Sequence, residues 1–500
     1  TGANNTAVGF EALKTNTTTS QNTAIGMYSL KVNIAANNTG VGYNALGANT
    51  TGTENVAVGK SAGAAVTTGS YNTALGASAL DVSTTGASNV AVGNNALGAN
   101  TTASNNTAVG TDALLLNTTG ASNVAVGQGA LDSNTTASNN VAVGKSALAA
   151  NTTGASNVAI GKDSLDSNTT GANNVAVGMD ALQANTTTSN NTAVGTQALI
   201  NNTAANNTAV GNDAMAATTT GASNVAVGAS SLGASTTGTE NVAVGKGALD
   251  ATGAGTDGSY NAAVGNDALG ANTEGQFNVA VGRRALYANT TADENTALGY
   301  LALYTNTTGQ SNTAVGVSTL QANTTASNNV AVGNRALTAN TTGTDNVAVG
   351  ANALDANTTA GSNTAIGDNA LGANTTGANN TAVGASSLLV NTTGLDNVAV
   401  GATALDANTT ASYGTAVGKG ALTTNTTGAY NTAVGFKALE VNTTGTQNVA
   451  VGSNALDANT TASYNTAMGY AALGANTTGS ENVSMGWNSL DANTTGANNV

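Results

Sequence analysis

The sequence contains no histidine, no cysteine and no proline. Without histidine and cysteine, the chain cannot build a Ser-His-Asp triad, a Cys-His pair or the common zinc sites. Without cysteine it also has no disulfide framework and no thiolate chemistry. Lack of cysteine is consistent with an extracellular bacterial or viral fibre. We therefore expect a chain that is not an enzyme and has no catalytic, cofactor-binding or metal-binding residues.

Charged and aromatic residues are also scarce, at 7% and 3% of the chain, whereas glycine occurs 63 times. The net charge is -14 and the pI about 4.1, and only Arg283 and Arg284 are adjacent basic residues. Nucleic-acid binding needs clustered Lys and Arg, so we expect no nucleic-acid partner. Disorder is the alternative for so polar a chain, but it predicts few β-branched residues, and Val, Thr and Ile recur here at fixed spacing.

No stretch approaches the roughly 18 consecutive apolar residues of a membrane helix, and no signal-peptide pattern follows Thr1. We expect no membrane contact by this segment. The chain opens inside a repeat and stops at Asn499-Val500, two residues into the next, without the atypical caps of repeat proteins. We expect residues 1–500 to be one continuous repeat array cut from a longer protein that carries the caps, anchor and signal elsewhere.

A short motif ending in A-V-G recurs through the whole chain. Its glycine occurs 29 times, and 25 of the 28 intervals span seventeen positions; two span sixteen, and the one of twenty marks a three-residue loop insertion near 251–258. So strict a period indicates a solenoid, whose units bury their apolar faces only by stacking on one another. At about 4.8 Å per coil, 29 coils predict a rod of roughly 140 Å. Scarce charge suits such stacking, because a charge in every coil would form a repelling row.

Residues 123–139, N-V-A-V-G-Q-G-A-L-D-S-N-T-T-A-S-N, represent one coil. Val124–Val126 predicts a strand with alternating faces, Gly127 a break at positive φ, and Ala130-Leu131 a second short strand. Val126 and Leu131 are expected to meet inside the coil, which places Ala125 and Ala130 outside. Since those alanine positions admit little but small residues, we expect the alanine rows to pack against partner chains in a homo-oligomer.

The rest of the coil is polar. Asn134-Thr135-Thr136 predicts a turn in which Asn and Thr bond to the backbone. Asn140, which begins the next coil, predicts an internal asparagine ladder. A helix is excluded, because glycine and the N-T-T clusters leave no uninterrupted run of helical length.

The repeat N-V-A-V-G-x-x-A-L resembles the head repeats of YadA-like trimeric autotransporter adhesins, whose motif reads N-S-V-A-I-G-x-x-S. Asn157–Gly161, N-V-A-I-G, and Asn363–Gly367, N-T-A-I-G, match its phase. The resemblance implies a left-handed parallel β-roll, intertwined as a homotrimer and displayed on a bacterial surface for attachment. The coil is longer here, by the N-T-T-G turn, and no neck, stalk or membrane barrel is present in the sequence. Similar arrays occur in phage tail-fibre proteins.

The sequence thus predicts an all-β parallel β-solenoid of about 29 coils, each of seventeen residues. The expected function is a non-enzymatic structural fibre or adhesin head, extracellular and on a bacterial cell surface. A phage tail-fibre shaft on a virion is the alternative, and the two are not separable from these residues. An ice-binding solenoid is a third alternative, because threonine ladders can order water. It is weaker, because such faces usually pair threonines at i and i+2, whereas here Asn134 and Thr136 share a side and Thr135 lies opposite.

Several residue patterns partly match those of known sites. Two carboxylates can make a glycosidase, but the acids occur mostly at free turn positions, where we expect solvated side chains. Gly253–Gly258 matches G-x-G-x-x-G but precedes another A-V-G strand instead of a helix, so we expect a looped-out turn. Calcium at Asp257 or Asp293-Glu294 lacks EF-hand spacing. Asp132, Asp166, Asp250 and Asp355 are examples of acidic residues at the free turn positions, where a glycosidase pair would have to lie.

Two surface features remain open. Asn-Thr-Thr and Asn-Asn-Thr match glycosylation acceptors in most coils, although turn and ladder chemistry is the simpler interpretation. Tyr413, Tyr430 and Tyr464 share one position in nearby coils, where they could form a small adhesive patch.

Overall fold

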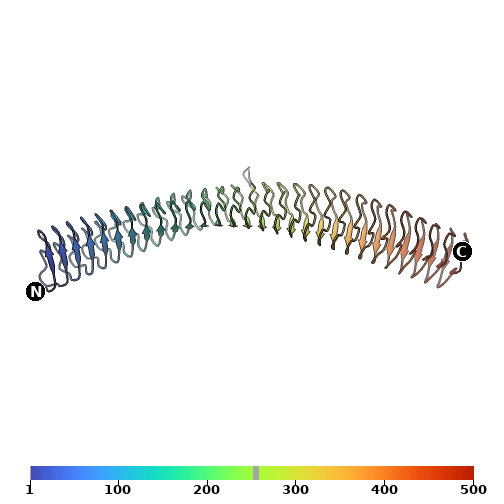
Figure 1. Ribbon diagram of the computed structural model, residues 1–500, viewed down its shortest axis with the longest axis horizontal. Coiled ribbons are helices and arrows are strands. Elements are labelled where there is room, and N and C mark those ends of the chain that lie inside the picture. The colour runs from blue at the N-terminus through green and yellow to red at the C-terminus, as the bar shows by residue number, and fades with distance from the viewer. Residues whose placement is uncertain (1, 252–257) are drawn as a thin grey trace. The chain divides into compact units, whose positions relative to one another are not determined.

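The computed structural model describes residues 2–251 and 258–500 (Figure 1). These fall into two compact units: described residues 2–247 form unit 1, and residues 248–251 with 258–500 form unit 2. Each unit is a stack of coils built from three-residue strands and turns, and no helix occurs among the described residues. Accordingly, nothing in this part of the chain is a helix long and apolar enough to cross a bilayer.

Unit 1 contains fifteen strands and unit 2 contains fourteen. Each strand ends at the residue directly before one of the recurring glycines. Those of unit 1 are β1 Thr6–Val8, β2 Thr23–Ile25, β3 Thr39–Val41, β4 Val56–Val58, β5 Thr73–Leu75, β6 Val90–Val92, β7 Thr107–Val109, β8 Val124–Val126, β9 Val141–Val143, β10 Val158–Ile160, β11 Val175–Val177, β12 Thr192–Val194, β13 Thr208–Val210, β14 Val225–Val227 and β15 Val242–Val244. Those of unit 2 are β16 Ala262–Val264, β17 Val279–Val281, β18 Thr296–Leu298, β19 Thr313–Val315, β20 Val330–Val332, β21 Val347–Val349, β22 Thr364–Ile366, β23 Thr381–Val383, β24 Val398–Val400, β25 Thr415–Val417, β26 Thr432–Val434, β27 Val449–Val451, β28 Thr466–Met468 and β29 Val483–Met485.

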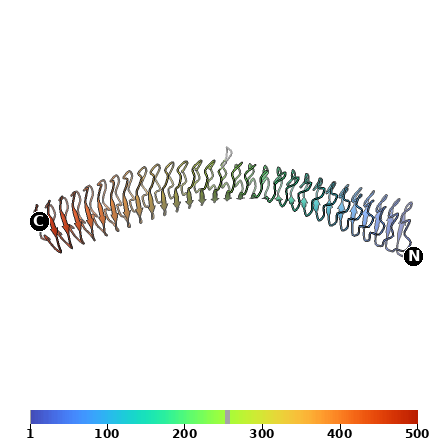
Figure 2. The ribbon, with the colours of Figure 1, turned by 180° about the vertical axis from the view of Figure 1, so that it is seen from behind.

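Within each unit, consecutive strands pair in parallel and in register. Between β8 and β9, for example, Ala125 pairs with Ala142 and Val126 with Val143, one period further along the chain. Figure 2, which shows the ribbon from behind, also places the strands of each unit along one side of its stack of coils. The expected parallel β-solenoid is confirmed, because within each unit every coil lies directly on its neighbour and aligns equivalent positions into rows.

The inward and outward faces of the strand are the reverse of the expectation. Ala125, Ala130 and Leu131 are completely buried, whereas Val124 and Val126 are only half-buried. The prediction that Val126 faces inward and the two alanines outward is therefore wrong. The reason is strand alternation: Asn123 is buried, so the residue two places further, Ala125, must share its side.

Ala130-Leu131 is not a second strand, which corrects the other local expectation. Leu131 has a φ of 53°, in the left-handed region, and its N–H donates to the carbonyl of Ala147 at 3.0 Å. This bend aims both Ala130 and Leu131 inward instead of at opposite faces. The core of a regular coil is therefore two alanines and one leucine, stacked row upon row.

Two asparagine ladders complete the interior. In the first, the N–H of Asn140 donates to the side-chain oxygen of Asn123 at 3.0 Å, and the side-chain amide of Asn140 donates to the carbonyl of Gly154 at 3.0 Å. In the second, the amide of Asn134 donates to the side-chain oxygen of Asn117 at 2.8 Å and to the carbonyl of Ala137 at 3.1 Å. The expected internal ladder is confirmed, and the second satisfies polar groups that burial would otherwise leave unpaired.

The landmark glycine is required by both conformation and space. Gly127 has a φ of 138°, as its expected role as a strand breaker demands. A Cβ at this position would lie 2.3 Å from the carbonyl oxygen of Gly144 in the next coil. The glycine row is thus a place where the backbones of successive coils approach closely. The proposed loop at Gly253–Gly258 lies outside the described residues, except for Gly258.

Candidate interaction surface

The outer side of each strand row is apolar. The first and third residues of each strand point outward, and we call these two rows the valine face. The third residue is Val, Ile, Leu or Met in every strand, and it is half-buried or exposed throughout. In β14, Val225 and Val227 keep 37% and 39% of their surface exposed. Each unit therefore carries a continuous apolar strip along its stack.

A strip of this extent is unusual for an isolated soluble chain. The largest apolar patch on a typical monomer covers about 300–600 Å² and is often functional. In both units the valine face adds two further outward residues with every coil, although threonine takes the first position in 14 of the 29 described strands, such as β7 and β12. Nothing in the described part of the chain covers it, so it is the main candidate for a contact surface.

This surface was missed in the sequence, although a signal for it was present. The small residues at the Ala125 and Ala130 positions suggested close packing against other chains. The structure explains them instead by the narrow interior of the coil, where both are buried. The informative position was that of Val126, which stays apolar in every strand although it faces outward.

Aromatic side chains gather at the position that precedes the buried asparagine, or that precedes Gly414 where glycine replaces this asparagine. Tyr413 and Tyr430 stack with ring centroids 4.9 Å apart and an angle of 8° between the rings. Both are about half exposed, and Tyr464 is similarly exposed two coils further along. The expected tyrosine patch is thus formed by the first two residues, while Gln447 in the intervening coil separates Tyr464 from them.

A second stack at the same position was not anticipated. Tyr260 and Phe277 lie 5.0 Å apart with an angle of 3° between the rings. Rows of identical positions bring rings from consecutive coils close enough to stack. The sequence signal was the spacing of the two aromatics, because Phe277 follows Tyr260 by one full repeat period.

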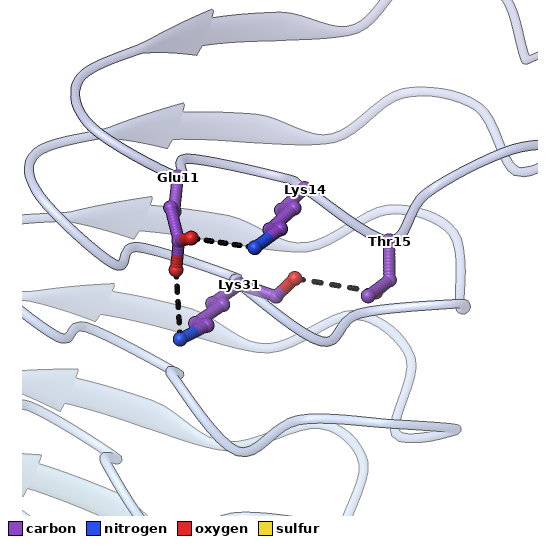
Figure 3. Close-up of polar contacts among 4 residues, drawn as sticks. All are labelled: Glu11, Lys14, Thr15 and Lys31. Atoms are coloured by element: carbon purple, nitrogen blue, oxygen red, sulfur yellow. Dashed lines mark hydrogen bonds and ion pairs between the residues drawn. The ribbon is translucent and has the colours of Figure 1, made fainter.

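The first coils hold a compact cluster of charged side chains (Figure 3). The carboxylate of Glu11 lies 2.5 Å from the ammonium of Lys14 and 2.7 Å from that of Lys31. The hydrogen bonds from Lys14 and Lys31 lower the pKa of Glu11, and Glu11 in turn raises the pKa of Lys31. The hydroxyl of Thr15 donates to the carbonyl of Lys31 at 3.2 Å. Lys31 therefore connects two coils through its ammonium and its carbonyl.

Aromatic rings lie beside this cluster. Phe10, Tyr28 and Tyr43 make successive edge-to-face contacts, with centroids 5.7 and 6.1 Å apart. The ammonium of Lys31 lies 4.7 Å from the centre of the Tyr28 ring. The contact between Lys31 and Tyr28 is a cation–π interaction, and it adds to the ion pairs that Glu11 forms with Lys14 and Lys31. They fix the side chains of the outer turn in these coils.

The acids at the turns are less solvated than expected. Asp132, Asp166, Asp250 and Asp355 are all half-buried. Burial raises the pKa of Asp166 and of Asp355. These residues come from separate coils, and across the described chain no cavity opens beside them.

The calcium candidates are engaged in local contacts. A carboxylate oxygen of Asp293 accepts the N–H of Gln276 at 2.7 Å, and Glu294 accepts the hydroxyl of Ser311 at 3.1 Å. Asp257 lies outside the described residues. Among the residues that the structure describes, no three acidic side chains are grouped so as to hold a metal ion.

The two kinds of glycosylation motif differ in accessibility. In Asn-Thr-Thr the asparagine is buried, as Asn134 is, and its amide is held by the second ladder. In Asn-Asn-Thr the first asparagine is exposed, as Asn105 is. In the folded coil only the second motif therefore presents its acceptor amide to solvent.

Comparison with known proteins finds no matching family model and no match among curated protein sequences. The functional argument therefore depends on the surface of the solenoid itself.

Proposed function

We propose that this chain is the shaft or head of a structural surface fibre, an extracellular β-solenoid rod on a bacterial cell that mediates attachment. Its role would not be enzymatic. The observation that carries the proposal is the valine face, which runs along a stack of coils in strict register. Such a strip supports lateral association of rods, and the resemblance to trimeric adhesin heads favours a homotrimer.

The energetics favour association through this face. Burying a valine side chain fully stabilises by roughly 1.5–3 kcal/mol. Val225 and Val227 still expose about two-fifths of their surface, so covering the pair contributes about 1 kcal/mol per coil. Summed over the coils of one unit, this is comparable with the cost of association, which is about 4–15 kcal/mol.

The test is the mass of the chain in solution. We expect light scattering to give three times the chain mass of 47.8 kDa. Replacing Val126 and Val143 with lysine, together with the equivalent residues of the next coils, places charges on the face and should yield single chains. Thr136→Lys and Thr153→Lys are matched controls in an exposed row away from the strands, and they should leave the mass unchanged. A wild-type monomer would contradict the proposal.

Attachment itself would use side chains that protrude from the rod. Tyr413 and Tyr430 form the best-defined exposed pair. If they contact the target, Tyr413→Ala/Tyr430→Ala should weaken adhesion of rod-coated particles to cells or matrix without changing the mass of the rod. Unchanged adhesion would remove the tyrosine pair from the proposal and leave the fibre role standing.

A phage tail-fibre shaft is the second candidate, because the same rod would serve it equally well. Binding of labelled rods to intact bacteria, compared with binding to host matrix, separates the two roles. An ice-binding role has one supporting feature, an exposed threonine row at the Thr136 position of nearly every coil. Thermal hysteresis in a freezing assay would favour it.

A further inference from the structure

The two ends of each strand carry opposite charges. One end is the position before the buried asparagine, which we call the acidic edge; the other is the position after the glycine, which we call the basic edge. Glu54 and Lys60 occupy these positions on either side of β4. The acidic edge holds Glu54 and Glu240 in unit 1, and Glu294, Asp345, Asp396 and Glu481 in unit 2. The basic edge holds Lys60, Lys145, Lys162 and Lys246 in unit 1, and Arg283 and Lys419 in unit 2.

The separation is nearly complete in a chain with few charges. Of the eleven basic residues, six lie on the basic edge and none on the acidic edge. Asp368 is the single acid on the basic edge. Apart from the half-buried Asp396, the residues of both edges are exposed. Within the described chain no acidic-edge carboxylate forms an ion pair. Glu294 and Asp345 accept neutral hydrogen bonds from Ser311 and Asn328. On the basic edge, Lys162 pairs with Asp163 of its own chain.

We propose that the two edges, which border the valine face, select a parallel arrangement of associated chains, in which all rods point the same way. When two rods meet face to face and run parallel, the acidic edge of one lies opposite the basic edge of the other. The same holds around any ring of parallel rods, including a trimer. When the rods run antiparallel, each edge lies opposite its own kind. The few charges on each side of the contact then have mostly the same sign, which disfavours that arrangement.

Two coils place the opposite charges at the same level. Glu54 and Lys60 flank β4, and Glu240 and Lys246 flank β15. Parallel rods without an axial shift bring such residues from neighbouring chains to the same height. The charges therefore favour equal register as well as equal direction. The valine face supplies the affinity, and because exposed pairs contribute little individually, the edges act on the choice between orientations.

The inference rests on the self-association proposed above, and the first experiment separates the two. The chain has no cysteine, so one introduced cysteine is a unique labelling site. Thr51 and Thr220, both exposed, lie ten coils apart within unit 1, which is roughly 48 Å at about 4.8 Å per coil. Thr51→Cys chains carrying a donor dye are mixed with Thr51→Cys chains carrying an acceptor, and separately with Thr220→Cys chains carrying the acceptor. We expect stronger energy transfer in the first mixture than in the second.

Each outcome of this experiment is decisive. Absent transfer in the first mixture, or weaker transfer there than in the second, in a sample that light scattering shows to be oligomeric, overturns the parallel arrangement and leaves the fibre function intact. Equal transfer in both mixtures shows that the edges do not select an orientation and also overturns the inference. A monomer at all concentrations overturns both proposals.

A charge reversal tests the physical cause. Replacing the six acidic-edge residues with lysine makes both edges basic, so the dissociation constant of the wild-type assembly should rise at least about tenfold at low salt, and high salt should restore association. Reversing both edges together should recover wild-type affinity, which also controls for folding. An acidic-edge variant that is folded by circular dichroism and associates like wild type would contradict the role of the edges.

Discussion

The side-chain oxygen of Asn49 is buried opposite Val66 and accepts no hydrogen bond. In regular coils the corresponding oxygen is satisfied by the next asparagine, as that of Asn134 is by the amide of Asn151 at 3.0 Å. Val66 occupies that position one coil after Asn49 and has no side-chain amide to offer. Val66 is itself buried, near Gly63, which replaces the core leucine. The buried Val66 side chain occupies space that the missing leucine at position 63 leaves free. It cannot donate a hydrogen bond, however, so the second asparagine ladder is broken at this coil.

Restoring both residues should therefore stabilise this coil. We expect Gly63→Leu/Val66→Asn to raise the free energy of unfolding by about 1–3 kcal/mol, from one recovered buried hydrogen bond and a filled leucine site. Hydrogen exchange of coils 3 to 5 measures the effect locally, as suits a repeat array. Val66→Asn alone leaves a void and Gly63→Leu alone crowds Val66, so each single variant should be less stable than the double. Additive single effects would contradict this account.

The first ladder is interrupted at Gly414. Its N–H donates to the side-chain oxygen of Asn397 at 2.8 Å, but glycine offers no side-chain oxygen to Asn431 in the next coil. A Cβ here would meet its nearest neighbour, the Asn397 oxygen, at 3.1 Å. We expect Gly414→Asn to stabilise by about 1 kcal/mol, measured as a shift of the urea midpoint. Gly414→Ala adds the Cβ without the amide, and an equal gain there would show that the ladder is not the cause.

The glycine row should be intolerant of any side chain. A Cβ on Gly127 would overlap the carbonyl of Gly144, at a φ that alanine rarely adopts. We expect Gly127→Ala to cost more than about 2 kcal/mol and to abolish exchange protection in the coils on either side. Gly129 is the matched control: its φ is 63° and nothing lies within 4 Å of an added Cβ. Gly129→Ala should be tolerated, since Ser146 takes that position in the next coil with a similar φ.

Buried turn acids should give the solenoid an unusual response to pH. Burial raises the pKa of Asp406 and of Asp457 above the ordinary carboxyl value, and one buried oxygen of Asp406 accepts no hydrogen bond. The folded state therefore binds more protons than the unfolded state between the ordinary pKa, near 4, and the raised pKa. Stability contributed by these groups is present below that window and decreases as pH rises through it.

We expect Asp406→Asn to raise the melting temperature at pH 7 and to have little effect at pH 4. Melting curves followed by circular dichroism at the two pH values check this difference. Glu54→Gln, at an exposed carboxylate, is the control for the change in net charge. A larger effect of Asp406→Asn at pH 4 than at pH 7 would contradict the assigned cause.

The sequence alone determined the solenoid, its period and its internal asparagine ladder. Because similar residues recur at every seventeenth position, each short repeat can bury its apolar side chains only by stacking on the next, with equivalent positions aligned. The glycine at position 127 and the asparagine at position 140 could be interpreted from local chemistry, because positive φ and amide ladders are properties of single residue types.

The tertiary structure alone decided which side of the strand faces inward. Alternation divides Val124–Val126 into two sides but does not say which one is the core, and residue size suggested the wrong answer. The left-handed bend at Leu131 settles it, since it turns leucine inward and leaves room only for alanine across the coil. Whether a row is interior or surface depends on how the chain closes its coil, and that closure is a property of all the residues of a repeat together.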